Sequence, residues 1–393
     1  MTSPVAHIRR FHAELTGIRR DLHAHPELSF QEQRTSGVVA DYLRKLGIET
    51  HTGIAKTGIV GVIQGKKSNG KAIGLRADMD CLPMHEQNNF PHKSRHEGRM
   101  HACGHDGHTT MLLGTARYLA ETRNFDGTAH LIFQPAEEGG GGANVMLREG
   151  LFDRFPCETV YALHNWPGLA AGKMAVRPGP VLAATDEMRI TIRGRGGHGA
   201  MPHLTADPVV AAAKVITALQ TIASRNANPL DAIVVSVCSM ETSQLGTFNV
   251  IPSHVLLVGT VRTFKPGTRD LAERRVREIA GSISQALGTS AAIEYRRGYP
   301  ATVNAEREAI FAAKVGERVF GAANVITDAE PTMGGEDFSY MLQARPGAYV
   351  FLGQGGGPSG CFLHNPGYDF NDEVIPLGAG YLAALVEESL PLK

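Results

Sequence analysis

The spacing of apolar residues changes near residue 180, and this change limits the folds that the chain can adopt. Up to that point, short apolar runs typical of strands alternate with segments in which apolar residues recur at helical spacing. Beyond it, residues 187–193 alternate apolar and polar side chains, as in a strand with one buried face. The earlier pattern returns after Tyr299-Pro300. We therefore predict an α/β domain with a central β-sheet flanked by helices, into which a smaller α+β domain is inserted.

The length of the chain also favours two domains. A chain of 393 residues is longer than a single hydrophobic core usually supports. The change in pattern places the larger domain at residues 1–183 and 299–393, and the inserted domain at residues 184–298. The main predicted elements are helices over 3–47 (with a break at His25-Pro26), 105–122, 207–221 and 269–287, and strands over 58–63, 72–76, 128–133, 160–163, 187–193, 233–240, 255–263 and 349–352.

Charge and cysteine content argue against several classes of partner. The 39 Lys and Arg residues balance the 39 Asp and Glu residues, which gives no support for binding to nucleic acid or to an anionic membrane. No apolar run approaches the roughly 18 residues of a membrane span, and residues 1–20 show no secretory signal. The five cysteines are odd in number and widely spaced, which indicates a reducing compartment. We therefore predict a cytoplasmic protein.

The segment 101–108 (HACGHDGH) gives the strongest indication of chemistry. It contains Cys103 and His105, whose thiolate and imidazole suit Zn²⁺ or similar ions. The segment opens a predicted helix, and the positive end of the helix dipole would favour the thiolate. A buried cysteine beside helix-capping residues is the alternative. One cysteine, three histidines and an aspartate within one short segment favour metal binding.

The segment 134–142 (QPAEEGGGG) places two adjacent carboxylates, Glu137 and Glu138, between an apolar strand and a glycine-rich turn. Adjacent side chains on an extended backbone point to opposite sides, so one could bind a metal while the other holds the attacking water. A solvated acidic pair is the alternative. The position favours function, because ligand sites in α/β sheets lie at the carboxyl ends of strands.

Two further histidines extend the set of candidate ligands. His164 follows a predicted strand, and His364 follows a glycine-rich loop near the C-terminus, although a lone histidine is more often structural. The full set is Cys103, His105, Glu138, His164 and His364. Five donors exceed what one closed tetrahedral site needs, which suggests two ions or one ion with open positions. The chain lacks the GxSxG, GxxxxGK[ST] and HExxH motifs of other catalytic sites.

Three other motifs give weaker indications. Asp78 and Asp80 lie two residues apart at a predicted strand end, so they share one face and could orient a ligand histidine or cap the strand. In the segment 194–203, glycines accompany two histidines, His198 and His203, and could present one of them to a substrate or form a hinge. The segment 333–339 (MGGEDFS) could cap the helix that follows, or let a substrate approach the backbone closely.

Four motifs in combination are highly specific: MHACGHDGH (100–108), FQPAEEGGGGA (133–143), GGHGAMPH (196–203) and GGEDFS (334–339). With them, the chain resembles the M20 family of metallo-aminoacylases and carboxypeptidases. Within that family it is similar to the hippurate hydrolases, N-acyl-amino-acid amidohydrolases and plant auxin-conjugate hydrolases. The resemblance begins at residues 22–28 and ends at residues 364–366. It implies a metal-binding catalytic domain and an inserted domain that serves as lid and dimerisation surface.

The resemblance implies a pair of divalent metal ions. Their ligands would be Cys103, His105, Glu138, His164 and His364. Asp78 stands where other branches of the family carry a ligand histidine, so Asp78 and Asp80 would have a supporting role. Cysteine and histidine favour Zn²⁺, whereas the carboxylate and open positions also allow Mn²⁺, Ni²⁺ or Co²⁺.

The resemblance also implies catalytic and binding roles. Glu137 would be the general base and acid. His198 would stabilise the oxyanion, acting on the substrate of the neighbouring subunit. Asn249 and Arg262 would help to hold the carboxylate of the substrate.

On this basis we predict metal-dependent hydrolysis of the amide bond of N-acyl amino acids, such as hippurate or N-acetyl amino acids, to a carboxylic acid and a free amino acid. A metal-activated water would attack the acyl carbon, with Glu137 as base. The alternatives are a dipeptidase or N-carbamoyl-amino-acid hydrolase on the same scaffold, a non-catalytic metal-binding protein, and a structural dimer with one zinc ion. We expect a homodimer or homotetramer with a small-molecule substrate and no nucleic-acid or membrane partner.

Overall fold

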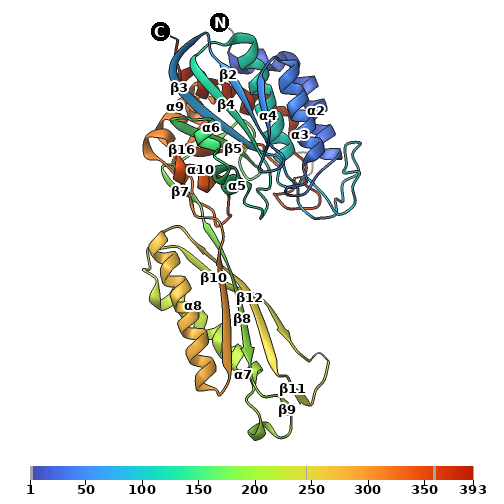
Figure 1. The fold of residues 1–393 in the computed structure, drawn as a ribbon, viewed down its shortest axis with the longest axis vertical. Helices are drawn as coiled ribbons and strands as arrows, with labels where there is room; N and C mark the ends of the chain where they lie inside the picture. The colour runs from blue at the N-terminus through green and yellow to red at the C-terminus, as the bar shows by residue number, and fades with distance from the viewer. Residues whose placement is uncertain (1–2, 245, 357–359, 393) are drawn as a thin grey trace. The chain divides into compact units, whose positions relative to one another are not determined.

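The structure is a computed structural model that describes residues 3–244, 246–356 and 360–392 (Figure 1). The chain divides into two compact units. The first consists of Met1–Val181, Val303–Glu330 and Asp337–Lys393, and the second of Leu182–Thr302 and Pro331–Glu336. Within the described ranges, none of the helices combines the length and the apolar character needed to cross a membrane.

A mixed sheet forms the centre of the first unit (Figure 1). Its strands, in spatial order, are β1 (Glu49–Ile54), β2 (Gly58–Gln64), β4 (Asp126–Gln134), β3 (Lys67–Asp78), β5 (Thr159–Trp166), β16 (Gly347–Gly353), β6 (Met174–Ala175) and β15 (Val325–Ile326). The strands β4, β3, β5 and β16 run parallel to one another. All of β16 is buried, as expected for a continuous apolar run in the middle of a parallel sheet.

Helices cover both faces of this sheet. They are α1 (Pro4–Ile8), η1 (Arg9–Phe11), α2 (His12–Ala24), α3 (Gln33–Lys45), α4 (His105–Thr122), α5 (Gly142–Arg148), α6 (Leu151–Arg154), α9 (Glu306–Phe320), η4 (Ala322–Asn324), α10 (Phe338–Ala344), η5 (Asp372–Val374) and α11 (Ile375–Ser389). The helices α4 and α11 pack against each other over the main apolar core, and α5 packs against α10. This arrangement confirms the predicted α/β class.

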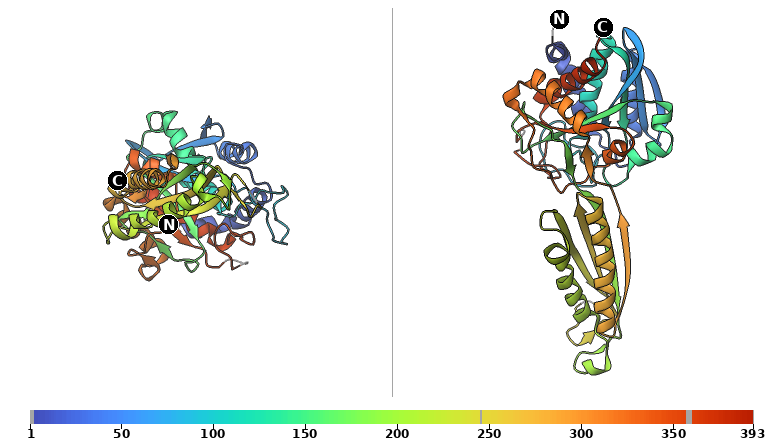
Figure 2. Two further views of the ribbon diagram at one scale, coloured as in Figure 1. Left: turned by 90° about the horizontal axis from the view of Figure 1, so that it is seen from below. Right: turned by 90° about the vertical axis from the view of Figure 1, so that its left-hand side faces the viewer.

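The second unit has a four-stranded antiparallel sheet in its described part. In spatial order its strands are β10 (Ile233–Thr242), β12 (His254–Thr263), β8 (Ala184–Arg193) and β13 (Ser290–Arg297). Alternate residues of β8 are buried, as its apolar and polar alternation predicts. The helices α7 (Pro208–Leu219) and α8 (Pro266–Ala286) lie side by side on the sheet (Figure 2). Its short elements are β9 (Gly197–His198), η2 (Pro202–Leu204), η3 (Ile222–Asn226) and β11 (Val250–Ile251). The strands β7 (Gly179–Leu182) and β14 (Thr302–Asn304) pair with each other and belong mostly to the first unit.

Candidate metal centre

Three adjacent strands of the first unit end at one edge of the sheet. Because β4, β3 and β5 are parallel neighbours, their carboxyl ends meet there. β3 ends at Asp78, and β4 ends at Gln134, shortly before Glu137. β5, which we expected to end at residue 163, continues to Trp166 and includes His164. The sheet therefore brings together side chains that lie far apart in the sequence.

The five predicted ligands lie together at this edge. Their candidate ligand atoms form overlapping groups, and within each group all atoms are within 4.8 Å of one another. The groups are Cys103, His105 and His164; Cys103, Glu138 and His364; and His105, Glu137 and Glu138. Cys103 Sγ lies 3.5 Å from His164 Nε2, and His364 Nε2 lies 3.4 Å from Glu138 Oε1. Because the groups share members, the donors form one cluster.

The cluster has the properties of a cation site. Among the described residues, His105 Nε2 is buried without a hydrogen-bond partner, and so is Glu138 Oε1, whose contact with His364 is an ion pair without hydrogen-bond geometry. Leaving a buried polar atom unpaired costs about 1–3 kcal/mol, and a cation bound between these atoms would remove that cost. Thiolate, imidazole and carboxylate are the donor types that Zn²⁺ and other divalent transition metals accept. The residues present therefore fit divalent metal ions.

The protonation of two donors also bears on metal binding. Burial lowers the pKa of His164 well below its usual value, so the ring is neutral, which is the form that binds a metal. Burial and the Glu138 carboxylate raise the pKa of the Cys103 thiol well above its usual value. A cation stabilises the thiolate and reverses this second effect. Metal binding at the cluster is therefore expected to release a proton from Cys103.

Asp80 connects the candidate ligands with the glutamate pair. Its Oδ1 accepts the backbone N–H of Glu137, and its Oδ2 accepts that of Glu138, both at 3.0 Å. Ser29 Oγ donates to the same Oδ2 at 2.8 Å. The carbonyl oxygen of Asp80 lies 3.0 Å from His105 Nδ1. One aspartate thus fixes the orientation of a ligand imidazole and the position of both glutamates.

Asp78 belongs to a buried charged network that sequence analysis did not identify. Its Oδ2 accepts from Arg76 Nη1 at 2.6 Å, and its Oδ1 lies 2.6 Å from His108 Nδ1. Burial raises the pKa of Asp78, but the neighbouring cations lower it by more, so that it lies well below its usual value. Arg76 also donates to Asp337 at 3.1 Å and to Gln134 at 2.7 Å. The available signal was an arginine within an apolar strand, which is costly unless it is paired.

The loop that presents Glu137 depends on an unusual backbone. Ala136 has φ +55°, in the left-handed region, immediately before Glu137. A Cβ on Gly142 would lie 1.7 Å from the Pro135 carbonyl oxygen, so the turn requires glycine there. The backbone N–H of Asp337 donates to Glu137 Oε1 at 3.4 Å. The carboxylate of Glu137 is therefore held from the motif 333–339, whose role the sequence left open.

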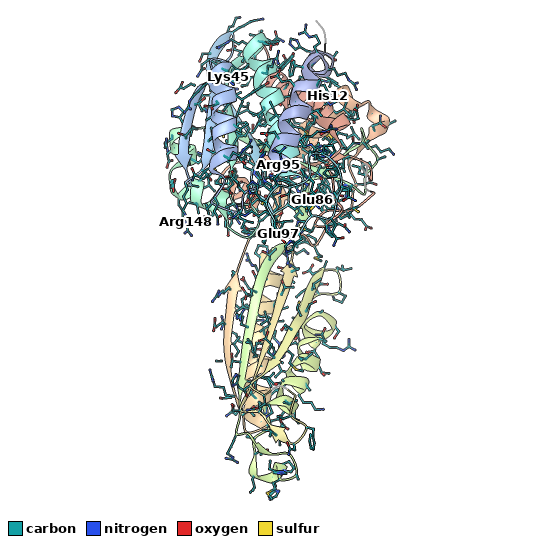
Figure 3. All side chains as sticks on the ribbon, turned by 90° about the vertical axis from the view of Figure 1, so that its right-hand side faces the viewer. His12, Lys45, Glu86, Arg95, Glu97 and Arg148 are labelled. Carbon is teal, nitrogen blue, oxygen red and sulfur yellow. The ribbon has the colours of Figure 1, made fainter. Side chains whose placement is uncertain are left out.

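A second buried network lies behind the start of α4. His23 Nδ1 is 2.8 Å from Asp106 Oδ2, and His23 Nε2 is 3.3 Å from Glu86 Oε1; Glu86 is labelled in Figure 3. Arg19 Nη1 also lies 3.5 Å from Asp106 Oδ2. Burial lowers the pKa of His23, but the Asp106 and Glu86 carboxylates outweigh it and raise the pKa to about 9. The segment that carries Cys103 and His105 is thereby anchored by a charged pair.

Two predicted residues of the second unit lie close together. His198, on β9, is exposed, and its Nδ1 accepts the backbone N–H of Ala200 at 3.1 Å. It pairs with Val250 across the two short strands. The N–H of Gly199 donates to the carbonyl oxygen of Asn249 at 2.7 Å, and Asn249 is also exposed.

Arg262 lies on β12 of the four-stranded sheet, whereas His198 belongs to the separate two-stranded sheet of β9 and β11. Arg262 pairs with Thr185 at the start of β8, whereas His198 follows Arg193, which pairs with His254 at the far end. The strand between these two pairs is roughly 25 Å long. Arg262 is half-buried beside a surface hollow of about 290 Å³. Among the described residues, the guanidinium of Arg262 forms no salt bridge; the nearby Asp186 pairs with Arg269 instead. Burial lowers the pKa of Arg262.

Known proteins resemble both the sequence and the fold. Residues 74–388 match the model of peptidase family M20/M25/M40. A hippurate hydrolase of Campylobacter jejuni is 41% identical over 95% of this chain and 95% of its own length. An N-acetyl-L-cysteine deacetylase of Bacillus subtilis is 39% identical over 92% and 85%. The crystal structure of the Bacillus subtilis YXEP protein, a dinuclear metal binding peptidase from the M20 family, is 33% identical with a TM-score of 0.84, over 97% and 99%.

An α/β unit with clustered Cys, His and Glu side chains at the carboxyl ends of its strands is typical of a metal-dependent hydrolase. The chain belongs to peptidase family M20/M25/M40. This confirms the family resemblance and the prediction that the chain is an enzyme that hydrolyses amide bonds.

Proposed function

We propose that the chain hydrolyses N-acyl amino acids to a carboxylic acid and a free amino acid. The observation that carries this proposal is the position of Glu137, whose carboxylate lies within 4.8 Å of ligand atoms of His105 and Glu138. The names of the relatives support the substrate class, because hippurate is N-benzoylglycine and N-acetyl-L-cysteine is also an N-acyl amino acid.

The proposal includes two divalent ions. They would be held by Cys103, His105, Glu138, His164 and His364. Such ions polarise an amide carbonyl and lower the pKa of water toward neutrality. The dinuclear centre named for the YXEP protein supports the number of ions. Zn²⁺ or Mn²⁺ is our first expectation for the metal, with Ni²⁺ or Co²⁺ as alternatives.

Glu137 would move the proton. It removes a proton from the attacking water and returns it to the nitrogen of the leaving amine. The backbone contacts from Asp80 and Asp337 support this role, because they fix the glutamate before the substrate arrives. Asp80 would also keep His105 oriented toward the metal.

The second unit would supply the remaining contacts. Arg262, which has no carboxylate partner among the ion pairs of the described residues, would bind the carboxylate of the substrate with the help of Asn249. His198 would stabilise the oxyanion. Arg262 pairs with Thr185 at one end of β8, and His198 follows Arg193 at the other end, so one small substrate cannot contact both residues of one chain; His198 would therefore come from a neighbouring subunit. This supports a homodimer or homotetramer.

The five free cysteines support a cytoplasmic location.

The test is release of the amine from hippurate and from a panel of N-acetyl amino acids, with protein reconstituted separately with Zn²⁺ and Mn²⁺. Metal-dependent release that is lost in Glu137→Gln is the expected result. Release from dipeptides or N-carbamoyl amino acids alone would replace the proposal with one of those activities. Binding of one zinc ion without any hydrolysis would favour a structural role.

A further inference from the structure

An aromatic pair adjoins the candidate ligands. Trp166 lies two residues after His164 on β5, and Phe362 lies two residues before His364. The Trp166 and Phe362 rings meet edge to face, with centroids 5.2 Å apart. Trp166 is also 6.4 Å from the His164 ring and 4.7 Å from the Phe351 ring. Trp166 thus lies beside the ring of one candidate ligand, and Phe362 lies two residues from another in the sequence.

This pair keeps apolar surface exposed. Phe362 is 48% exposed, and it is the single aromatic residue among the large exposed apolar side chains of the first unit's described residues. Gly168 packs beside the pair: a Cβ there would lie 3.3 Å from Phe362 Cε2 and 3.6 Å from Trp166 Nε1. An exposed aromatic ring beside a catalytic centre offers an edge and a face to a second ring.

We propose that Trp166 and Phe362 determine substrate specificity by contacting an aromatic group next to the scissile amide bond. This inference rests on the proposed function, because it places the substrate at the donor cluster. The aromatic group belongs either to the acyl part, as in hippurate, or to the amino-acid side chain, as in N-acetylphenylalanine. The two substrates share the chemistry that the pair recognises, and the experiment separates them.

The chain offers a direct probe of this contact, because Trp166 is its one tryptophan. In Glu137→Gln protein reconstituted with Zn²⁺, its fluorescence is titrated with hippurate, N-acetylphenylalanine and N-acetylglycine. We expect a saturable change of emission with an aromatic ligand and a much smaller one with N-acetylglycine. Adding Phe362→Ala should raise the Kd of the aromatic ligand about tenfold and leave that of N-acetylglycine within about twofold.

The same comparison is made with kcat/KM in otherwise wild-type protein. Phe362→Ala should lower the ratio of hippurate to N-acetylglycine about tenfold, and Phe362→Leu should lower it less. Ile310→Ala, at a 45% exposed apolar residue on α9, is the matched control and should leave the ratio unchanged. An effect confined to N-acetylphenylalanine would also support the contact and assign it to the amino-acid side chain.

Two results would overturn the inference. One is an equal loss for all three ligands, which is what a ring that only stabilises its loop would give. The other is an unchanged ratio together with a silent tryptophan. Failure of the proposed function gives a different result, since binding would then change Trp166 emission while wild-type protein released no amine.

Discussion

The donor cluster of the first unit and His198 of the second unit differ in how firmly the chain holds them. In the cluster, Cys103, His105 and His164 are buried, although His364 is exposed. A single residue, Asp80, contacts His105 and the backbone of both glutamates. His198 is exposed on a two-residue strand, and its side chain accepts a hydrogen bond from the backbone nearby. A metal site requires fixed geometry, and the first unit provides it from its own residues. A residue that completes a site in another subunit must instead remain accessible.

Glu137→Gln is the sharpest test of the first region. Loss of the general base should lower kcat by about 10³, within the range of 10²–10⁴ for such catalysis. The metal content should stay at two ions per chain, because the proposed ligands are intact. The measurement is steady-state hydrolysis with metal analysis of the same sample. Glu317→Gln, at an exposed glutamate on α9, is the control. Turnover close to wild type in Glu137→Gln would remove Glu137 from the mechanism.

His198→Ala tests the second region. Loss of an oxyanion donor should lower kcat by about 10² to 10³. Because the side chain is exposed, the melting temperature and the metal content should not change. Co-expression with Glu137→Gln should then restore about a quarter of wild-type activity, since half of the dimers are mixed and each mixed dimer has one intact site. Activity that stays at the level of the separate variants would place both residues in one subunit's site.

His23→Gln removes a buried histidine, and its effect is compared below with removal of an exposed one, His203. The pKa of His23 is raised to about 9 in the folded protein, from 6.5 in the unfolded chain. The contribution of protonated His23 to the free energy of unfolding is therefore complete below pH 6.5. It is lost as the pH rises through 9, a difference on the order of 3 kcal/mol. Urea unfolding of chelator-treated protein at pH 6 and pH 9.5 measures it. Wild type should lose this stability and His23→Gln should not.

The exposed His203 provides the control for that experiment, because His203→Gln should keep the pH dependence of wild type. Equal pH dependence in wild type and His23→Gln would show that the pair with Asp106 does not stabilise the fold.

Asp80→Asn should have the smallest effect of the four. The amide retains one acceptor oxygen but loses the charge and the second acceptor, so it holds His105 and the glutamates less well. Metal affinity should fall about 10-fold to 100-fold, as for other residues that orient ligands. Competition with a chelator of known affinity measures the change. Asp328→Asn, at an exposed aspartate of the same unit, should bind metal like wild type. An unchanged affinity in Asp80→Asn would limit Asp80 to holding the loop.

Elements with a strong local pattern could be predicted from the sequence. The helix expected over 105–122 has those bounds, and β8 shows the alternating burial expected over 187–193. β5 was predicted too short because His164 and Asn165 are polar. Asn165 is nevertheless fully buried and bonded to His108 and Tyr368. Local patterns contain no information on partners that are supplied by distant segments.

The same limit applies to the site. Residue type and short motifs were enough to select candidate donors that the fold brings together, because grouped Cys, His and Glu side chains are typical of metal sites. Arg76 received no role, since its partner Asp337 lies 261 residues away in the chain. The distance between His198 and Arg262 was also not predictable, because it depends on the register of β8 against β12.

The position of β16 in the sheet imposes an order on synthesis. This strand, Gly347–Gly353, lies between β5 and β6, although both of those precede the whole second unit in the chain. A nascent chain that has just completed the second unit therefore still exposes one open edge of β5, the strand that carries His164. Open edges of this kind are the usual starting points of aggregation. Premature termination between residues 337 and 346 would thus yield a chain that retains its second unit but lacks a closed central sheet and His364. Such fragments should be cleared or should aggregate rather than accumulate as a metal-binding intermediate.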